Sequence, residues 1–176
     1  ILGNAEITNA FNGGKSADLL SAGEEDTTRG IYLIGGTVKN IYGGSDSSGI
    51  VSASNVYIQS GKAINVYGGN NQGGTTTTTN IKIQGGNIEN AYGGGEKAET
   101  TTSNIEVIGG FINNLYGGGN QAGVSTTNVK IKKGNIGILF GGSNINGNVK
   151  QSYISTGDEN ESQLIIDTIY GGNNRG

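Results

Sequence analysis

Short segments with the pattern of β-strands recur along this chain and are separated by glycine pairs. Residues 81–83 alternate apolar and polar side chains, as a half-buried strand does, and residues 88–92 form a second short segment. The threonine run at 75–79 is β-branched and favours a third strand. Glycine pairs break the chain between these segments, because glycine takes positive φ without steric cost. The pattern therefore predicts an all-β fold with no significant helix.

An aromatic residue followed by a glycine pair recurs at nearly constant spacing. Neighbouring occurrences in the middle of the chain lie 24 or 25 residues apart, whereas the first and last intervals are 31 and 30 residues. A repeat of this length is typical of solenoids, in which each unit forms one coil. We therefore expect about seven coils of 24–25 residues, marked by Phe11, Tyr42, Tyr67, Tyr92, Tyr116, Phe140 and Tyr170.

A single-stranded, right-handed parallel β-helix fits this repeat best. A leucine-rich repeat would show L-x-x-L-x-L, but leucine is sparse and β-branched residues fill the inward positions. A calcium-binding nonapeptide roll would need recurring aspartates, which the chain lacks. We expect one solenoid domain over residues 1–176, as a segment of a longer repetitive chain. The two long intervals predict turn insertions at 15–29 and 157–163, the second of seven residues if 152–157 align with 56–61.

Stacking of coils turns each repeated residue into a ladder. Two apolar ladders are expected in the core, and asparagines form two more, because their amides can bond to one another and tolerate corner dihedrals. We interpret the asparagines as structural corners. The apolar ladders are Ile31, Val56, Ile81, Ile105 and Val129, and Leu33, Ile58, Ile83, Val107, Ile131 and Ile154; the asparagines are Asn9, Asn40, Asn65, Asn90 and Asn114, and Asn55, Asn80, Asn104 and Asn128.

The aromatic ladder has two interpretations. A row of exposed rings would form a platform for sugar rings, which pack their CH faces on aromatic side chains. Alternatively, each ring folds over the glycine pair that follows it and seals a corner. We favour the structural interpretation for Tyr42, Tyr67, Tyr92 and Tyr116.

The outward position of the first strand in each unit is the best candidate for a ligand-binding strip. Exposed tyrosines next to charged residues are a pattern found in binding surfaces, although charge pairing between neighbouring strands explains the charged members as well. The strip consists of Tyr32, Tyr57, Lys82, Glu106, Lys130 and Tyr153. The threonine rows at 75–79, 100–102 and 126–127 raise ice binding as a remote alternative, but a β-strand face is the simpler interpretation.

Composition narrows the chemistry further. The chain lacks cysteine and histidine, which excludes disulfides, thiolate metal sites and the commonest general base. The formal charge of −3 argues against a nucleic-acid partner, and no apolar stretch is long enough to span a bilayer. We expect no cofactor. Acidic clusters at 24–26 and at Asp158, Glu159 and Glu161 would offer oxygen ligands to Ca²⁺, but solvated loops explain them more simply.

Residues 85–95 and 109–119 share the pattern G-G-x-I-x-N-x-Y-G-G-G and are followed by threonine-rich segments. This pattern resembles the glycine-rich β-helical repeats of bacterial cell-surface and adhesin-like proteins, whose fold is similar to that of pectin lyases. The resemblance implies a fold more than an activity. Relatives that cleave polysaccharides carry a catalytic Arg or Lys and aligned carboxylates, whereas here Arg29 and Arg175 lie outside the central coils and Glu89 and Glu106 stand alone.

These observations favour a non-enzymatic, extracellular or cell-surface segment that acts as a stalk, spacer or adhesin and binds glycans along one face. Two alternatives remain open. One is a filament or sheath subunit that pairs with like subunits through open solenoid ends. The other is a carbohydrate-processing module whose catalytic residues lie outside this segment.

Overall fold

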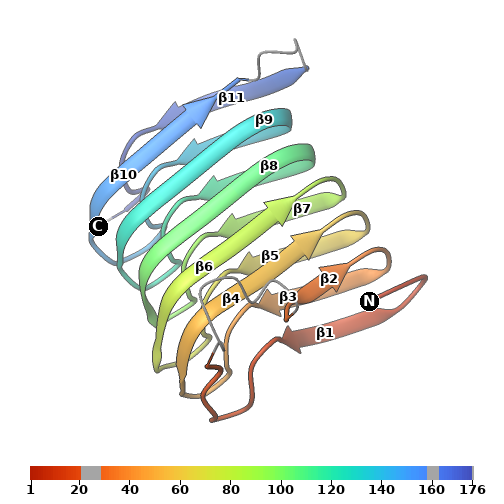
Figure 1. Ribbon diagram of the computed structural model, residues 1–176. Coiled ribbons are helices and arrows are strands. Elements are labelled where there is room, and N and C mark those ends of the chain that lie inside the picture. The colour runs from red at the N-terminus through yellow and green to blue at the C-terminus, as the bar shows by residue number, and fades with distance from the viewer. Residues whose placement is uncertain (21–28, 158–162, 176) are drawn as a thin grey trace.

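The computed structural model describes residues 1–20, 29–157 and 163–175, and in these ranges the chain forms a parallel β-solenoid without helices (Figure 1). The chain winds through eleven strands that are all paired in parallel. The all-β solenoid predicted from the repeat is therefore confirmed. The strands are β1 (Glu6–Phe11), β2 (Ile31–Leu33), β3 (Thr37–Tyr42), β4 (Ile50–Ile58), β5 (Lys62–Tyr67), β6 (Thr75–Ile83), β7 (Asn87–Tyr92), β8 (Glu99–Tyr116), β9 (Val124–Phe140), β10 (Val149–Thr156) and β11 (Leu164–Tyr170).

Two faces result from this winding. The first face contains β2, β4, β6, the first halves of β8 and β9, and β10, and it is turned to the viewer in Figure 1. The second face contains β1, β3, β5, β7, the second halves of β8 and β9, and β11. Strands β8 and β9 continue through the corner and so contribute to both faces. The threonine run and the following alternating segment form one strand, β6, rather than two.

The number of turns differs from the expected seven. A complete turn runs from one residue of the first apolar ladder to the residue before its counterpart in the next unit. The described chain contains five such turns, which start at Ile31, Val56, Ile81, Ile105 and Val129. The aromatic series also counts an incomplete turn at either end, which contributes to only part of the solenoid. The prediction is corrected to about five turns.

Aliphatic ladders fill the space between the two faces. The ladder of Leu33, Ile58, Ile83, Val107 and Ile131 is fully buried, and Val38, Ala63, Ile88, Ile112 and Ile136 face it from the second face. Each fully buried Ile, Leu or Val contributes about 1.5–3 kcal/mol of stability relative to an exposed one. Because every turn adds the same few side chains, stability accumulates turn by turn.

Glycine is required where neighbouring turns approach each other most closely. Gly36, Gly61 and Gly86 make the corner between the two faces with φ of 77°, 92° and 88°, a region that favours glycine. After the aromatic residue, a Cβ on Gly68 would lie 2.2 Å from the carbonyl oxygen of Gly93 in the next turn. The repeated glycine pairs thus allow turns to stack at strand spacing.

The register limits where the insertions fall. Leu19 pairs with Val51 and the backbone from Gly13 to Lys15 bonds to the neighbouring turn, so the first insertion lies after Leu19 rather than from residue 15. The second lies between Thr156, paired with Ile131, and Leu164, paired with Gly134. Eight residues separate Thr156 from Leu164 where three separate Ile131 from Gly134, which makes the insertion five residues long, not seven.

Candidate functional site

The first five members of the predicted binding strip share one outward row on the first face. Tyr32 pairs with Tyr57, Tyr57 with Lys82, Lys82 with Glu106, and Glu106 with Lys130. The rings of Tyr32 and Tyr57 stack with their centroids 4.5 Å apart and their planes 14° from parallel. Two stacked tyrosines are therefore followed along the solenoid axis by charged side chains.

Tyr153 does not belong to this row, and its placement there is wrong. It pairs with Asn128, so it occupies the position of the next asparagine in the second asparagine ladder, and Ser155 takes the place beside Lys130. Ile154 correspondingly pairs with Val129 and extends the first apolar ladder instead of the second. The shift of two residues aligns Val149 with Val124 and Ser152 with Thr127 as well. With this register, Val149, Ser152 and Ile154 each lie beside an inward residue of similar type in the preceding turn. The alignment expected from the sequence gave such a match for Ile154 alone.

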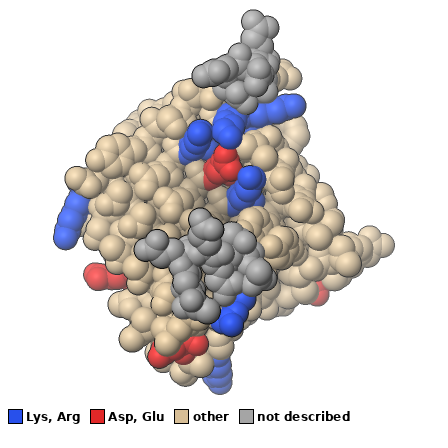
Figure 2. Space-filling view, viewed as in Figure 1, with Lys and Arg blue, Asp and Glu red and all other residues tan. Residues whose placement is uncertain are grey.

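Glu106 is the centre of an ion-pair cluster on the first face. Its carboxylate lies 3.1 Å from the Nζ of Lys82 and 2.7 Å from the Nζ of Lys132, which comes from the same strand as Lys130. The hydrogen bond from Lys132 is the main reason that the pKa of Glu106 is lowered, and Lys82 adds to the effect. Figure 2 shows basic side chains gathered around an acidic one on this face. Lys132 was not singled out from the sequence, because it lies where the register between β8 and β9 shifts: Ile131 pairs with Val107 and Lys133 with Ile108.

The first asparagine ladder forms a continuous chain of side-chain hydrogen bonds. The Nδ2 of each asparagine donates to the Oδ1 of its counterpart in the preceding turn, at 2.8 Å from Asn40 to Asn9 and from Asn65 to Asn40, 3.0 Å from Asn90 to Asn65, and 2.9 Å from Asn114 to Asn90. The second ladder, from Asn55 to Asn128, bonds in the same way. With both hydrogen-bonding ends used between turns, these amides hold the stack together.

The aromatic ladder is buried from Tyr42 to Phe140. Consecutive rings from Phe11 to Tyr170 stack with centroids 4.7–5.1 Å apart and planes within 13° of parallel. Tyr42, Tyr67, Tyr92 and Tyr116 are only 4–6% exposed, so their faces are covered by one another and not open to a sugar. Burial raises the pKa of Tyr42 to about 12 and raises the pKa of the other three as well. The rings seal the corner of the solenoid.

Two further ladders were missed in the sequence. Hydroxyl groups inside the first face donate to the carbonyl oxygen of the first glycine of a glycine pair, as Thr79 does to Gly93 at 2.5 Å and Thr127 to Gly141 at 2.8 Å, and Ser54 and Ser103 do the same. In the loops after the aromatic ladder, carboxylates and amides bond between turns at Asp46, Asn71, Glu96, Asn120, Asn144 and Asn174. The hydroxyl ladder was detectable as the Ser or Thr directly before each ladder asparagine, whereas the loop ladder mixes residue types.

The threonine rows turn partly inward. Thr76, Thr79, Thr100 and Thr127 are buried, while Thr75 and Thr77 are exposed. The rows are in register between β6, β8 and β9, but their hydroxyls do not form one outward array. The backbone of this region is a regular strand face.

No group of three or more His, Cys, Asp or Glu side chains suited to a metal ion is found among the described residues. The acidic residues considered for Ca²⁺, at 24–26 and at Asp158, Glu159 and Glu161, lie outside that part of the chain. Within the described residues, no helix long and apolar enough to cross a membrane is found.

Comparison of the chain with protein-family models, with curated proteins and with solved structures found no match. The resemblance to glycine-rich surface repeats therefore rests on the repeat motif and on the solenoid fold alone. The fold is established by the structure, and the surface or adhesin role stays a prediction.

Proposed function

We propose that this chain is a non-enzymatic structural segment of an extracellular or cell-surface protein, where it serves as a rigid spacer with an adhesive face. The observation that carries the proposal is the continuity of its ladders. Aliphatic, aromatic and asparagine contacts repeat between successive turns and bind a turn to both neighbours, and each ladder hydroxyl adds a bond to a glycine carbonyl 14 residues further on. A rod packed at every level resists bending and local opening, which is what a spacer requires.

The engagement of the carboxylates supports a non-enzymatic role. Glu106 is held between two lysines with a lowered pKa, whereas a general acid needs a raised one. Glu89 accepts a hydrogen bond from Asn113 at 2.8 Å, and Glu96 accepts one from Asn120 at 2.9 Å. These pairings engage the three carboxylates in contacts between turns, which is what a structural role requires.

Rigidity is tested with two spin labels. The chain has no cysteine, so Lys15→Cys and Ile145→Cys on exposed loops give unique labelling sites. Five strand spacings separate these loops, or about 24 Å. Pulsed electron paramagnetic resonance should give one narrow distribution of distances between the two labels. This distribution should not change with temperature as long as the protein stays well below its unfolding temperature. A broad or bimodal distribution would contradict the spacer.

The adhesive face is the row of the predicted strip that the register keeps together, Tyr32, Tyr57, Lys82, Glu106 and Lys130. The facing sides of Tyr32 and Tyr57 cover each other, but Tyr32 is 37% exposed and offers its remaining ring surface to sugars. The lysines on this face favour a glycan that carries acidic groups. On a glycan array, the wild-type chain should bind acidic glycans and Tyr57→Ala should lose most of that signal. Tyr153→Ala is the matched control, because Tyr153 is exposed but lies outside the strip. Equal losses in both variants, or no binding by the wild type, would remove the adhesive role of this strip.

A second candidate is a filament subunit that stacks end to end with like subunits. Ile169 and Tyr170 of β11 are 48% and 51% exposed, whereas their counterparts Leu139 and Phe140 in the preceding turn are buried. A further turn of similar sequence would cover them and pair with the edges of β10 and β11. Light scattering should then show mass growing with concentration in the wild type but not in Ile169→Lys, and a monodisperse wild type would argue against assembly.

A further inference from the structure

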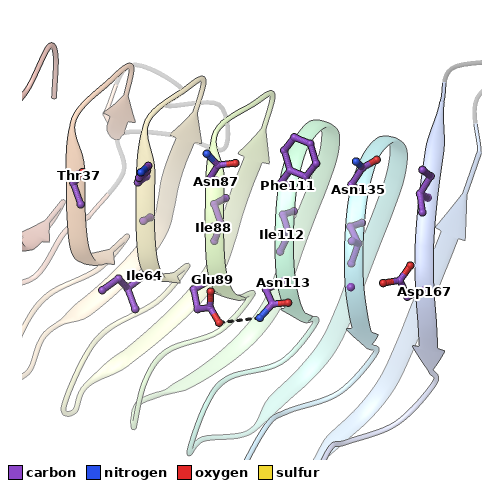
Figure 3. A pocket seen from close by; sticks show the side chains of 15 residues that line it. Thr37, Ile64, Asn87, Ile88, Glu89, Phe111, Ile112, Asn113, Asn135 and Asp167 are labelled. Atoms are coloured by element: carbon purple, nitrogen blue, oxygen red, sulfur yellow. Dashed lines mark hydrogen bonds between the residues drawn. The ribbon is translucent and has the colours of Figure 1, made fainter.

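A groove crosses the outer side of the second face, opposite to the tyrosine strip. It has a volume of about 630 Å³ and extends from Thr37 on β3 to Asp167 on β11, across the strands of five successive stacking steps (Figure 3). A second hollow of about 620 Å³ adjoins it at the corner formed by Gly36, Gly61 and Gly86, which have no side chains to fill it. Phe111 and Asn87 line both hollows, so the two form one trough along the solenoid axis.

The outward positions that line this groove do not follow the repeat. In the ladders, like residues stack on like, because each position is selected for its contact with the turns above and below. Here Lys62 pairs with Asn87, Asn87 with Phe111, Phe111 with Asn135, and Asn135 with Ile165. These side chains contribute little to stacking, so their identities are not explained by the fold.

Several apolar side chains in the groove are exposed to solvent. Phe111 is 59% exposed, Ile64 is 45% exposed and Ile165 is 44% exposed. Single exposed apolar residues are ordinary on a protein surface, but three that line one concave groove indicate a binding surface. Figure 3 shows the ring of Phe111 between Asn87 and Asn135 on the neighbouring strands.

Planar polar groups surround these apolar residues. Asn113 donates through Nδ2 to the Oε1 of Glu89 at 2.8 Å, which fixes both side chains across two strands (Figure 3). Asn87 and Asn135 flank Phe111 in the same row. The asparagine amides can donate to and accept from sugar hydroxyls, and the carboxylate of Glu89 can accept from them, which suits the alternating hydroxyls of a sugar ring.

We propose that this groove binds a neutral, extended polysaccharide lying along the solenoid axis. A pyranose packs its CH face on Phe111, and its hydroxyls bond to Asn87, Asn135 and the Asn113–Glu89 pair. Strands follow one another at 4.7–4.9 Å, close to the length that one pyranose occupies in an extended chain, so successive sugars meet successive strands. This site deepens the adhesive part of the proposed function and rests on it, but uses other residues than the tyrosine strip.

The charged side chains of the groove favour a neutral ligand. The groove contains one cation, Lys62, against the carboxylates of Glu89 and Asp167. An acidic polysaccharide would place its own carboxylates beside these two and be repelled. The lysines around Glu106, which suit an acidic glycan, lie on the other face.

The test measures binding of soluble neutral polysaccharides: hydroxyethyl cellulose, arabinoxylan, galactomannan and dextran, with polygalacturonate as the acidic probe. Affinity gel electrophoresis of the whole chain should show retardation by at least one neutral polymer. Phe111→Asn should weaken this binding about tenfold, since it removes the ring. The substitution places at position 111 the residue type found at Asn87 and Asn135 on the neighbouring strands. Circular dichroism should therefore show an unchanged fold. Ile50→Thr, which removes an exposed apolar residue from the first face, is the matched control and should bind as the wild type does.

Three outcomes would overturn the proposal: no retardation by any neutral polymer, retardation by polygalacturonate alone, or equal binding by Phe111→Asn and the wild type. If Tyr57→Ala abolishes binding to the neutral polymer while Phe111→Asn leaves it intact, the groove is excluded and the adhesive face on the other side stands. The rigidity of the rod, measured with spin labels, is independent of all these outcomes.

Discussion

Single positions within a ladder differ in how well their polar atoms are satisfied. Thr76 and Thr100 stack directly on each other inside the first face, and both are buried. The Oγ1 of Thr76 lies 3.4 Å from the Oδ1 of Asn70, but the position of Asn70 is taken by Gly95 in the next turn. The Oγ1 of Thr100 consequently has no hydrogen-bond partner in the described structure.

Replacing this buried hydroxyl should stabilise the protein. Thr100→Val removes an unsatisfied group and gives the residue type found at Val124, its partner in the following turn. We expect the free energy of unfolding to rise by about 1 kcal/mol. Thr76→Val, the matched control, loses a hydrogen bond and should lower it by about 0.5–1 kcal/mol. Urea unfolding of both variants measures the difference, and a destabilised Thr100→Val would show that its hydroxyl is satisfied in solution.

The sequence could not reveal this difference. It shows runs of threonine, but a run gives no period from which to tell inward from outward residues, and the partner of Thr76 lies in a loop six residues away. Tyr153 was misplaced for a related reason. Its resemblance to Tyr57 suggested an alignment by residue type, whereas the register is decided by which side chains reach the interior, here Val149, Ser152 and Ile154. Ladders of identical residues were predictable because stacking selects them.

At the scale of the element, the buried tyrosine ladder predicts a loss of stability in alkaline solution. Tyr42 has its pKa raised to about 12, and Tyr67, Tyr92 and Tyr116 also have raised pKa values, against about 10 in the unfolded chain. The folded protein therefore keeps these protons where the unfolded chain releases them. The contribution of these phenols to the free energy of unfolding is fully present below about pH 10. Above that pH the free energy of unfolding falls by up to about 1.4 kcal/mol per pH unit for each tyrosine.

Tyr42→Phe provides the control for this alkaline loss. Phe11 and Phe140 occupy the same ladder, so phenylalanine fits the stack but has no proton to lose. Denaturant unfolding between about pH 9 and pH 12 should give a shallower decline for the variant than for the wild type. Identical slopes would mean that the phenol of Tyr42 titrates equally in the folded and unfolded states.

The whole molecule behaves as a stack of nearly equal turns, and this can be tested by removing one. Deleting residues 81–104 joins Asn80 to Ile105, which occupies the same ladder position as Ile81. The shortened chain should fold, be about 4.8 Å shorter by small-angle X-ray scattering, and show a urea m-value lower by roughly a seventh, because 24 of the 176 residues are gone. Deleting 81–105 instead joins Asn80 to Glu106, which turns Glu106 inward and Val107 outward and should prevent cooperative folding. If both deletions unfold the chain, the turns are not interchangeable, and the solenoid depends on contacts specific to the missing one.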